Sequence, residues 1–516
     1  MGIPRALYNF ELYPLWDKFF SELGYEVVLS DETNDTIIHE GVEAVTADLC
    51  FPMKVAHGHI LNLLKKKIDY IFIPSLIDFS HKNDGFKRSY DCPWSQSLPY
   101  FINSAIDMRK YPATKLLEPK LSFRMGLEKS LKKMGDELGE NPLETKRAIK
   151  AAKDVQFQFY NNLRRRGKEV LGKLGKKRGF IIVSRPYNGN DPGLNLDLVE
   201  KMRELGMLPI PMEFLDLDTS LIIEDYPDIY WEYGQRILAA AQKIKQMNNL
   251  YPIYLTNFAC GPDSFISKYF NEEMDRPYLE LQIDEHSAEA GVITRLEAFG
   301  DTVKNWKGKK TEKKIPIKKK LKLSSSTDYN DRVIYIPYAD DQSYALESSL
   351  EAVGQKAKVM EVSDQKSLQE GQKVTTGREC YPCVLTTGDI IKLIKSDGFD
   401  PEKAAFFMGA AQGPCRFGQY LRFQEHLMKR LGYQNIPFLS LDSENSYGGY
   451  GLKFSILAWE GIVAIDILRN TQRLIRPDEV NKGETNRVYL KYRDKVRETI
   501  RRGKGVSSIM KEAASS

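Results

Sequence analysis

The chain of 516 residues is long enough for several domains, and its 42% hydrophobic and 28% charged residues are typical of a folded globular protein. The net charge of +5 is local in origin, because residues 304–322 contain ten lysines and one acidic residue. Without this segment the net charge falls from +5 to −4, so the basic excess does not indicate nucleic-acid binding.

Targeting signals are not apparent in the sequence. The first residues contain no apolar segment of the kind found in signal peptides. No run of about 20 apolar residues occurs either, since Glu460 and Asp466 interrupt the apolar stretch 456–468. We therefore expect a cytoplasmic protein without a membrane partner. In that reducing compartment, six cysteines favour metal or redox chemistry over disulfides.

The first part of the chain alternates short apolar strands with amphipathic helices, which predicts an α/β fold with parallel sheets. The segment 127–174 has helical spacing and few strand formers, so it predicts a helical insertion. The predicted strands are 26–29, 70–73, 179–184 and 251–255, and the predicted helices are 13–23, 53–66, 195–205 and 230–247.

A second α/β part follows a lysine- and serine-rich segment that has the composition of a linker. Its predicted strands are 333–336, 358–362, 405–408 and 437–439, and its predicted helices are 344–353, 388–396 and 418–431. The predicted domains are an α/β lobe at 1–125, the helical insertion at 126–175, a second α/β unit at 176–300, the Lys-rich linker at 301–330, a C-terminal α/β domain at 331–480 and a charged helical tail at 481–516.

A short internal repeat connects the two parts. Cys50 and Cys380 are each followed by an aromatic residue and a proline, at the predicted start of a helix. Cys383 falls where Met53 lies in the first copy. The repeat indicates two related lobes that each carry a cysteine at the same place.

The six cysteines divide into three before the linker and three after it. In a parallel α/β sheet, the loops at the carboxyl ends of strands converge on one crevice, and helix N-termini there favour anions. Thiolates on loops that are far apart in sequence can therefore lie close together in the fold. The two sets are Cys50, Cys92 and Cys260, and Cys380, Cys383 and Cys415.

Several kinds of chemistry are compatible with this spacing. Three thiolates would leave one iron of a [4Fe–4S] cubane open, and two such cubanes could share a bridging sulfide. The Cys380–Cys383 pair could also be a redox dithiol or part of a zinc site, and any single cysteine could be an ordinary core residue. No phosphate-binding loop G-x-x-x-x-G-K-[ST] occurs in the sequence.

The cysteine segments and several others resemble one family. Together they are similar to the acyl-CoA dehydratase activase-related branch of the 2-hydroxyacyl-CoA dehydratase/benzoyl-CoA reductase superfamily, which is related to the double-cubane cluster proteins. The segments that carry the resemblance are 2–7, 49–52, 91–93, 283–287, 291–299 and 413–420.

The resemblance implies Rossmann-like (flavodoxin-like) domains that bind iron–sulfur clusters. It implies one cubane on Cys50, Cys92 and Cys260, and another in the C-terminal domain on the second set. The implied cofactor is a double-cubane [8Fe–9S] cluster or, alternatively, one or two [4Fe–4S] clusters. His286, Arg378 and Arg416 are the candidates for proton supply near the cluster.

The implied function is that of a reductase component. A separate ATP-hydrolysing iron–sulfur activase would donate low-potential electrons, and the chain, expected to be a homodimer, would reduce a small molecule. One alternative is a 2-hydroxyacyl-CoA dehydratase-like subunit that binds an acyl-CoA. Another is a non-enzymatic electron carrier or metal-binding protein.

Overall fold

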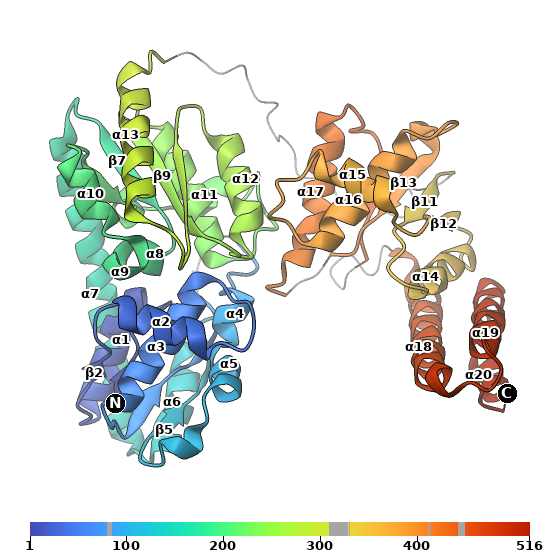
Figure 1. Cartoon of the computed structure of the whole chain (residues 1–516), viewed down its shortest axis with the longest axis horizontal. Helices are drawn as coiled ribbons and strands as arrows, with labels where there is room; N and C mark the ends of the chain where they lie inside the picture. Colours follow the sequence, from blue (N-terminus) through green and yellow to red (C-terminus); the bar gives the residue numbers. More distant parts are fainter. Residues whose placement is uncertain (80–84, 309–328, 330, 411–412, 442–448, 516) are drawn as a thin grey trace. The chain divides into compact units, whose positions relative to one another are not determined.

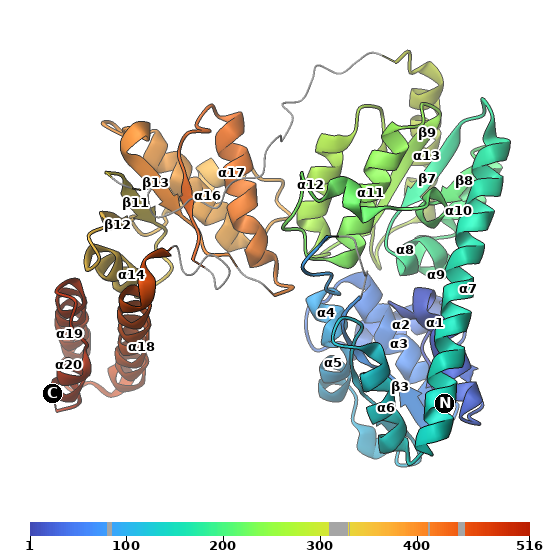
Figure 2. The same cartoon turned by 180° about the vertical axis from the view of Figure 1, so that it is seen from behind.

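The protein forms two compact units in a computed structural model that describes residues 1–79, 85–308, 329, 331–410, 413–441 and 449–515. The first unit comprises Met1–Pro316 with Gly413–Cys415, and the second comprises Ile317–Gln412 with Arg416–Ser516. Residues 309–328 and 330 of the predicted linker lie outside the described residues. Figures 1 and 2 show the elements of each unit from opposite sides.

The first unit begins with a parallel four-stranded sheet in the order β2-β1-β3-β5. Its core is aromatic, because Trp16 and Phe20 of α1 each place their ring 5.1 Å from the ring of Phe72. The elements are β1 (Gly2–Ile3), α1 (Asn9–Glu22), β2 (Val28–Leu29), α2 (Asp35–Ala44), α3 (Phe51–Lys65), β3 (Tyr70–Phe72), α4 (Pro93–Gln96), α5 (Leu98–Ala105) and β5 (Lys115–Leu117), beside a two-stranded sheet of β4 (Ser75–Asp78) and β6 (Lys120–Ser122).

The predicted helical insertion is confirmed as α6 (Leu127–Leu138) and α7 (Pro142–Leu174). The long α7 packs on α1, where the side chain of Gln156 bonds to the backbone of Glu11 and Leu15. Arg236 of α11 adds a buried ion pair to Glu11, at 2.7 Å. The Gln156 bonds fix the insertion against α1, and the Arg236–Glu11 pair links α1 to α11.

The second sheet of the first unit has the order β10-β9-β7-β8 and is parallel throughout. Its strand β7 is fully buried, as expected for a strand covered by helices on both faces. The elements are β7 (Gly179–Val183), α8 (Pro186–Asn190), α9 (Pro192–Asn195), α10 (Leu198–Glu204), β8 (Pro209–Pro211), α11 (Glu232–Lys245), β9 (Leu250–Asn257), α12 (Asp263–Glu273), β10 (Leu279–Ile283) and α13 (Glu289–Asn305).

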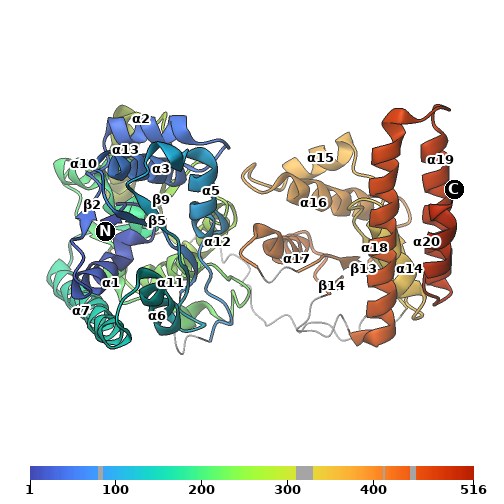
Figure 3. The same cartoon turned by 90° about the horizontal axis from the view of Figure 1, so that it is seen from below.

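The second unit contains a third parallel sheet, in the order β12-β11-β13-β14, followed by the C-terminal helices α18, α19 and α20 (Figure 3). The helical tail predicted for the C-terminus is confirmed. The elements are β11 (Val333–Ile336), α14 (Gln342–Glu351), β12 (Ala357–Val359), α15 (Gln365–Gln372), α16 (Tyr381–Ile394), β13 (Ala404–Phe407), α17 (Tyr420–Arg430), β14 (Phe438–Leu439), α18 (Gly451–Ile475), α19 (Glu484–Arg501) and α20 (Ser507–Ala514).

All three four-stranded sheets have the same winding. In each, the second strand in sequence lies on one side of the first, and the third and fourth lie on the other side. This is the strand order of flavodoxin-like folds, which place their ligand crevice at the carboxyl ends of the first and third strands. The predicted α/β fold class with Rossmann-like parallel sheets is therefore confirmed.

The internal repeat extends well beyond the cysteine motif. Gly41 and Gly58 lie where α2 and α3 cross, and Gly371 and Gly388 lie where α15 and α16 cross. A Cβ atom on any of these glycines would fall far inside contact distance of a carbonyl oxygen of the other helix. Each C-terminal glycine follows its counterpart by 330 residues, the spacing that also separates Cys50 from Cys380. The repeat is thus a pair of closely crossing helices whose second helix begins after a cysteine.

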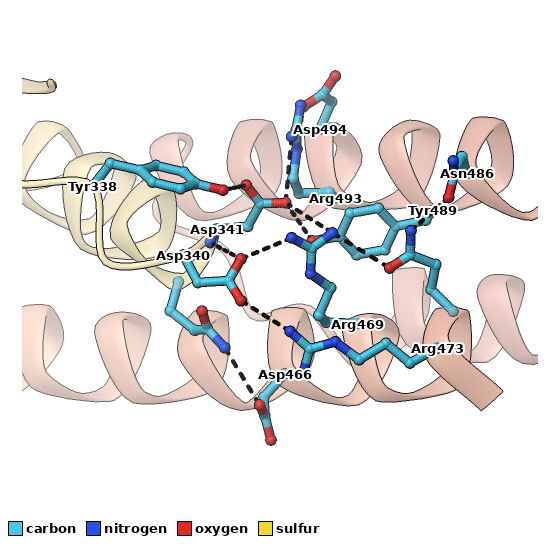
Figure 4. Close-up of polar contacts among 12 residues, drawn as sticks. Tyr338, Asp340, Asp341, Asp466, Arg469, Arg473, Asn486, Tyr489, Arg493 and Asp494 are labelled. Carbon is cyan, nitrogen blue, oxygen red and sulfur yellow. Dashed lines mark hydrogen bonds and ion pairs between the residues drawn. The ribbon is translucent and has the colours of Figure 1, made fainter. Parts of the chain in front are cut away.

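The C-terminal helices are joined to the third sheet by an ion-pair cluster that follows strand β11 (Figure 4). Asp341 is buried and accepts hydrogen bonds from the hydroxyls of Tyr489, at 2.5 Å, and Tyr338, at 3.0 Å. Burial raises the pKa of this carboxyl, but the hydrogen bonds and nearby arginines outweigh it and bring the pKa below its usual value. Arg469 of α18 pairs with the neighbouring Asp340 at 2.9 Å.

Some boundaries and elements differ from the prediction. The helix predicted at 388–396 begins at Tyr381, because Cys380 and Pro382 start it. The predicted linker overlaps the end of α13 at residues 301–305. Strands β4, β5, β6, β8 and β10 were not predicted. Strands β5 and β6 have only three residues each and begin with lysine. Within the described ranges, we find no helix with the length and apolarity needed to span a bilayer.

The two sheets of the first unit are also linked through a buried histidine. Thr33 donates a hydrogen bond to Asp191 at 2.6 Å, so its oxygen accepts from Nε2 of His59 at 2.9 Å. Nδ1 of His59 then accepts from the hydroxyl of Ser30, also at 2.9 Å. Burial, followed by the charge of Arg5, lowers the pKa of His59 to about 3. The imidazole is therefore neutral in the folded protein at neutral pH.

We expect Gly58→Ala and Gly388→Ala to lower the unfolding free energy by about 3 kcal/mol or more, the upper end for overpacking, because a carbonyl oxygen occupies the space of the new methyl group. Gly172→Ala is the matched control, since nothing lies within 4 Å of its Cβ position on α7. It should stabilise by roughly 0.5–1 kcal/mol. Calorimetric unfolding checks both, and equal stability of Gly58→Ala and Gly172→Ala would contradict the close helix crossing.

We expect the stability advantage of the wild type over His59→Gln to shrink as the pH falls. In the unfolded chain His59 gains a proton near pH 6.5, whereas the folded state resists protonation down to about pH 3. Acid therefore favours the unfolded wild type by up to about 1.4 kcal/mol per pH unit within this window. Urea unfolding at a series of pH values measures the difference, and a difference independent of pH would show that His59 takes up its proton as readily in the folded protein as in the unfolded chain.

Candidate functional site

Cys50 is the residue directly before helix α3. Its backbone is extended, with φ −66° and ψ 155°, and Pro52 stands in the first turn, where a missing amide hydrogen costs little. Burial raises the pKa of the Cys50 thiol to about 12, and the charge of Cys92 acts in the same direction. A hydrogen bond from the Met53 amide and the positive charge of Arg185 oppose this shift.

Cys92 has the same position at the start of α4. Asp91 orders the turn, since its carboxylate accepts hydrogen bonds from the Cys92 amide at 2.8 Å and the Ser95 hydroxyl at 2.6 Å. Burial and the charge of Asp91 raise the pKa of Cys92 to about 11. Backbone amides of Ser95 and Trp94 donate to the sulfur and oppose the shift.

Cys260 and Arg185 lie at the switch point of the second sheet. Arg185 follows β7, the first strand, and Cys260 follows the neighbouring third strand β9 after Ala259, whose φ is +59°. The Arg185 side chain is 2% exposed, and its Nη1 lies 2.6 Å from Oδ1 of Asp263, the first residue of α12. This is the crevice in which doubly wound α/β folds bind ligands.

The three thiols of the first set lie within electrostatic reach of one another and of Arg185. Burial raises the pKa of Cys260, Arg185 lowers it, and Cys50 and Cys92 raise it again. The pKa of the buried Tyr187 is raised by burial and responds to the same guanidinium and to all three thiols. The structure thus brings together cysteines that are 42 and 168 residues apart in sequence, around one buried cation.

The donor set fits an anionic iron–sulfur cluster. Amide donors to two of the sulfurs and a buried guanidinium would offset the negative charge of thiolates and cluster. Within the described part of the chain, no three His, Cys, Asp or Glu side chains are grouped to hold a single metal ion. In a cubane each thiolate binds its own iron, so its sulfur atoms stand farther apart than around one zinc ion.

The second set is divided between the two units. Cys380 begins α16 as Cys50 begins α3, and the Tyr420 hydroxyl hydrogen-bonds with it; burial and this bond raise the pKa of Tyr420. Cys383, one turn on, is fully buried like its counterpart Met53. Cys415 is exposed and lies in the segment Gly413–Cys415, which groups with the first unit.

The predicted proton donors have different surroundings. His286 is 85% exposed on the loop after β10, while the adjacent Glu285 forms an ion pair with Lys54, one turn after Cys50. Arg416 donates to the carbonyl of the exposed Arg378 at 3.2 Å, two residues before Cys380. Both arginines are therefore beside the second set, whereas the His286 side chain faces solvent.

Arg185 and Tyr187 were not predicted as site residues. The sequence did contain a signal, because Ser184-Arg185-Pro186-Tyr187 follows a predicted strand and begins a helix. A charged residue at the end of a strand becomes significant only when that strand is known to be the first of a doubly wound sheet. The strand order supplies that knowledge, and the sequence pattern does not.

Comparison with known families gives one match. Residues 1–215 match the family described as the CoA enzyme activase uncharacterised domain. The matched 215 of 516 residues include Cys50, Cys92 and Arg185 but neither Cys260 nor the second set. The match supports an activase-related family of the CoA-enzyme dehydratase group for this region, without a specific branch. Neither the curated proteins nor the solved structures contain a match to the chain.

We expect Arg185→Met to lower the unfolding free energy of the metal-free chain by about 3–5 kcal/mol, because it leaves the buried Asp263 carboxylate without its cation. The matched control is Arg203→Met, which removes an exposed pair with Glu200 and should cost no more than about 1 kcal/mol. Urea unfolding compares the two. Equal losses would mean that the Arg185–Asp263 pair is effectively solvated.

Proposed function

We propose that the chain is an iron–sulfur electron-transfer component of a CoA-enzyme activation system. The observation that carries this proposal is the convergence of Cys50, Cys92 and Cys260, from three separate loops, around the buried Arg185. The match of residues 1–215 to a CoA enzyme activase domain supports the biochemical setting. A bound cluster would supply one-electron transfer at low potential.

The residues around the first set have separable roles in this proposal. The three thiolates bind, and burial of Cys50 excludes water from its sulfur. Arg185 and the amides of Met53 and Ser95 offset negative charge, which favours the more reduced state and raises the reduction potential. Three protein ligands leave room for one further ligand from outside the chain.

The second set would hold a second cluster. Cys380 repeats the position of Cys50 at the start of a helix, which supports its role as a ligand. Arg378 and Arg416 lie beside Cys380 and would supply charge or protons there. A bridged double-cubane [8Fe–9S] cluster and two separate cubanes are both compatible with six cysteines, and the metal content distinguishes them.

The electrons would come from a separate ATP-hydrolysing iron–sulfur protein. This part of the proposal rests on the sequence, which has no phosphate-binding loop of the G-x-x-x-x-G-K-[ST] type. The final acceptor would be a small molecule or an acyl-CoA. The chain would then be the oxidoreductase component of a two-protein system.

Iron and acid-labile sulfide in anaerobically purified protein test the proposal. We expect about eight irons per chain in the wild type and a loss of about four in each of Cys50→Ala, Cys92→Ala and Cys260→Ala, because each replacement removes one of three ligands. Loss of all iron in every variant would indicate one bridged cluster. Full iron retention in all three variants would overturn the assignment.

Two conservative substitutions serve as controls. Met53→Leu preserves volume beside Cys50 and should keep the wild-type iron content. Cys383→Met places in the second lobe the residue that the first lobe already accommodates, so a loss of iron would identify Cys383 as a ligand rather than a core residue. About four irons in the wild type would favour the dehydratase-like subunit, and zinc without sulfide would favour a metal-binding carrier.

A further inference from the structure

Among the described residues, helix α18 is packed on one side only. Phe454, Leu457 and Ile465 are buried where α18 meets α14 and α19, and Gly461 allows close approach to Ala345 of α14. Figure 3 shows α18 as a long helix beside α19 at one side of the second unit. Its 25 residues correspond to a length of about 37 Å.

The opposite side of α18 is exposed and strongly apolar. Leu452 is 75% exposed, Trp459 69% and Leu474 78%. The first residues of this face recur at intervals of four, three and four, so they form a line along the helix. We call this face the α18 stripe; it consists of Leu452, Ile456, Trp459, Val463 and Ile467.

The α18 stripe is at the upper end of the apolar patches that a monomer exposes. From their exposed fractions, the five side chains present on the order of 600 Å², so two copies would bury about 1,200 Å² in total, the lower end of a standard interface. Contiguous patches of this size mark interaction sites. An exposed tryptophan at the centre of such a patch is the residue type that dominates binding energy.

We propose that the α18 stripe is the interface through which two copies of this chain associate. The area of the stripe is sufficient for a stable dimer. A symmetric dimer buries the same patch on both copies, so the patch must complement itself. A straight, almost uniformly apolar helix face meets that requirement, because any antiparallel pairing of two such faces buries apolar surface against apolar surface.

Few charges lie on this face. Between Leu452 and Ile467 the exposed side of α18 carries Lys453 and Asp466, which stand on opposite flanks of the stripe. Lys453 lies against Gly503, and Asp466 accepts a hydrogen bond from Gln342 of α14. Two copies can therefore bring their apolar lines together without burying a charge.

Sedimentation velocity of the purified full chain tests the proposal. We expect twice the chain mass for the wild type at high micromolar concentration. Trp459→Lys with Val463→Lys should raise the dimer dissociation constant at least about 100-fold, because it removes a central tryptophan and places like charges together. Far-UV circular dichroism should not change, since both side chains are exposed.

Two further variants identify the occupant of the stripe. Trp459→Glu with Val463→Glu should also be monomeric, whereas an equimolar mixture of the Lys and Glu proteins should form a heterodimer. The matched control is Leu143→Lys with Phe157→Lys on α7, two equally exposed apolar residues outside the stripe, and it should remain dimeric.

Three outcomes would overturn the proposal. The first is a wild type that stays monomeric at every concentration. The second is a failure of the Lys and Glu proteins to associate when mixed, which would mean that another part of the chain or another protein covers the stripe. The third is a monomeric wild type that floats with phosphatidylcholine–phosphatidylglycerol vesicles while the Lys variant does not, which would assign the stripe to a membrane surface.

Discussion

The buried ion pair between Arg185 and Asp263 is the interaction on which the first cysteine site depends. It joins the carboxyl end of β7 to the start of α12, and so fixes the loop that carries Cys260. A guanidinium with 2% exposure is tolerated only where its charge is compensated. Asp263 compensates it directly, and all three thiols of the first set lie within electrostatic reach of it.

This arrangement gives the buried cation two possible roles. In the metal-free chain it is a structural charge paired with one carboxylate. With thiolates and an anionic cluster nearby it would become the main positive charge of the site. Burial of Arg185 lowers the stability of the metal-free fold. In return, it places a positive charge in advance where the negative charge of a cluster would bind.

The repeated helix pairs impose a second constraint, which concerns the direction of the cysteine-bearing helices. Glycines at both crossings let the backbones touch, so α3 and α16 have little freedom to shift along their partners. The residue before each helix, Cys50 or Cys380, is therefore held at a defined point at the edge of its sheet. The difference between Met53 and Cys383 shows that the two lobes have diverged in the first turn of this helix.

Much of the fold could be predicted from the sequence, because strands and helices follow from local patterns of apolar residues. Buried strands such as β7 and β11 are short apolar runs, and the helical insertion has regular spacing over more than ten turns. The edge strands β5 and β6 were missed, since their three residues have no period and stand in the sheet only because a neighbouring strand offers hydrogen bonds. Helix α18 was not predicted, because its exposed side is as apolar as its buried side and the segment has no clear amphipathic pattern.

The sequence by itself determined the fold class and the repeat, and it singled out six cysteines as candidate ligands, since these depend on residue type and local spacing. Only the tertiary structure decided that Cys50, Cys92 and Cys260 lie within electrostatic reach of Arg185 and that His286 faces solvent. Those facts depend on strand order, which is set by how helices and strands pack over long distances. Packing of this kind leaves no periodic trace along the chain. The exposed stripe of α18 also appeared only in the folded protein, because both sides of this helix are apolar and the sequence does not show which side packs.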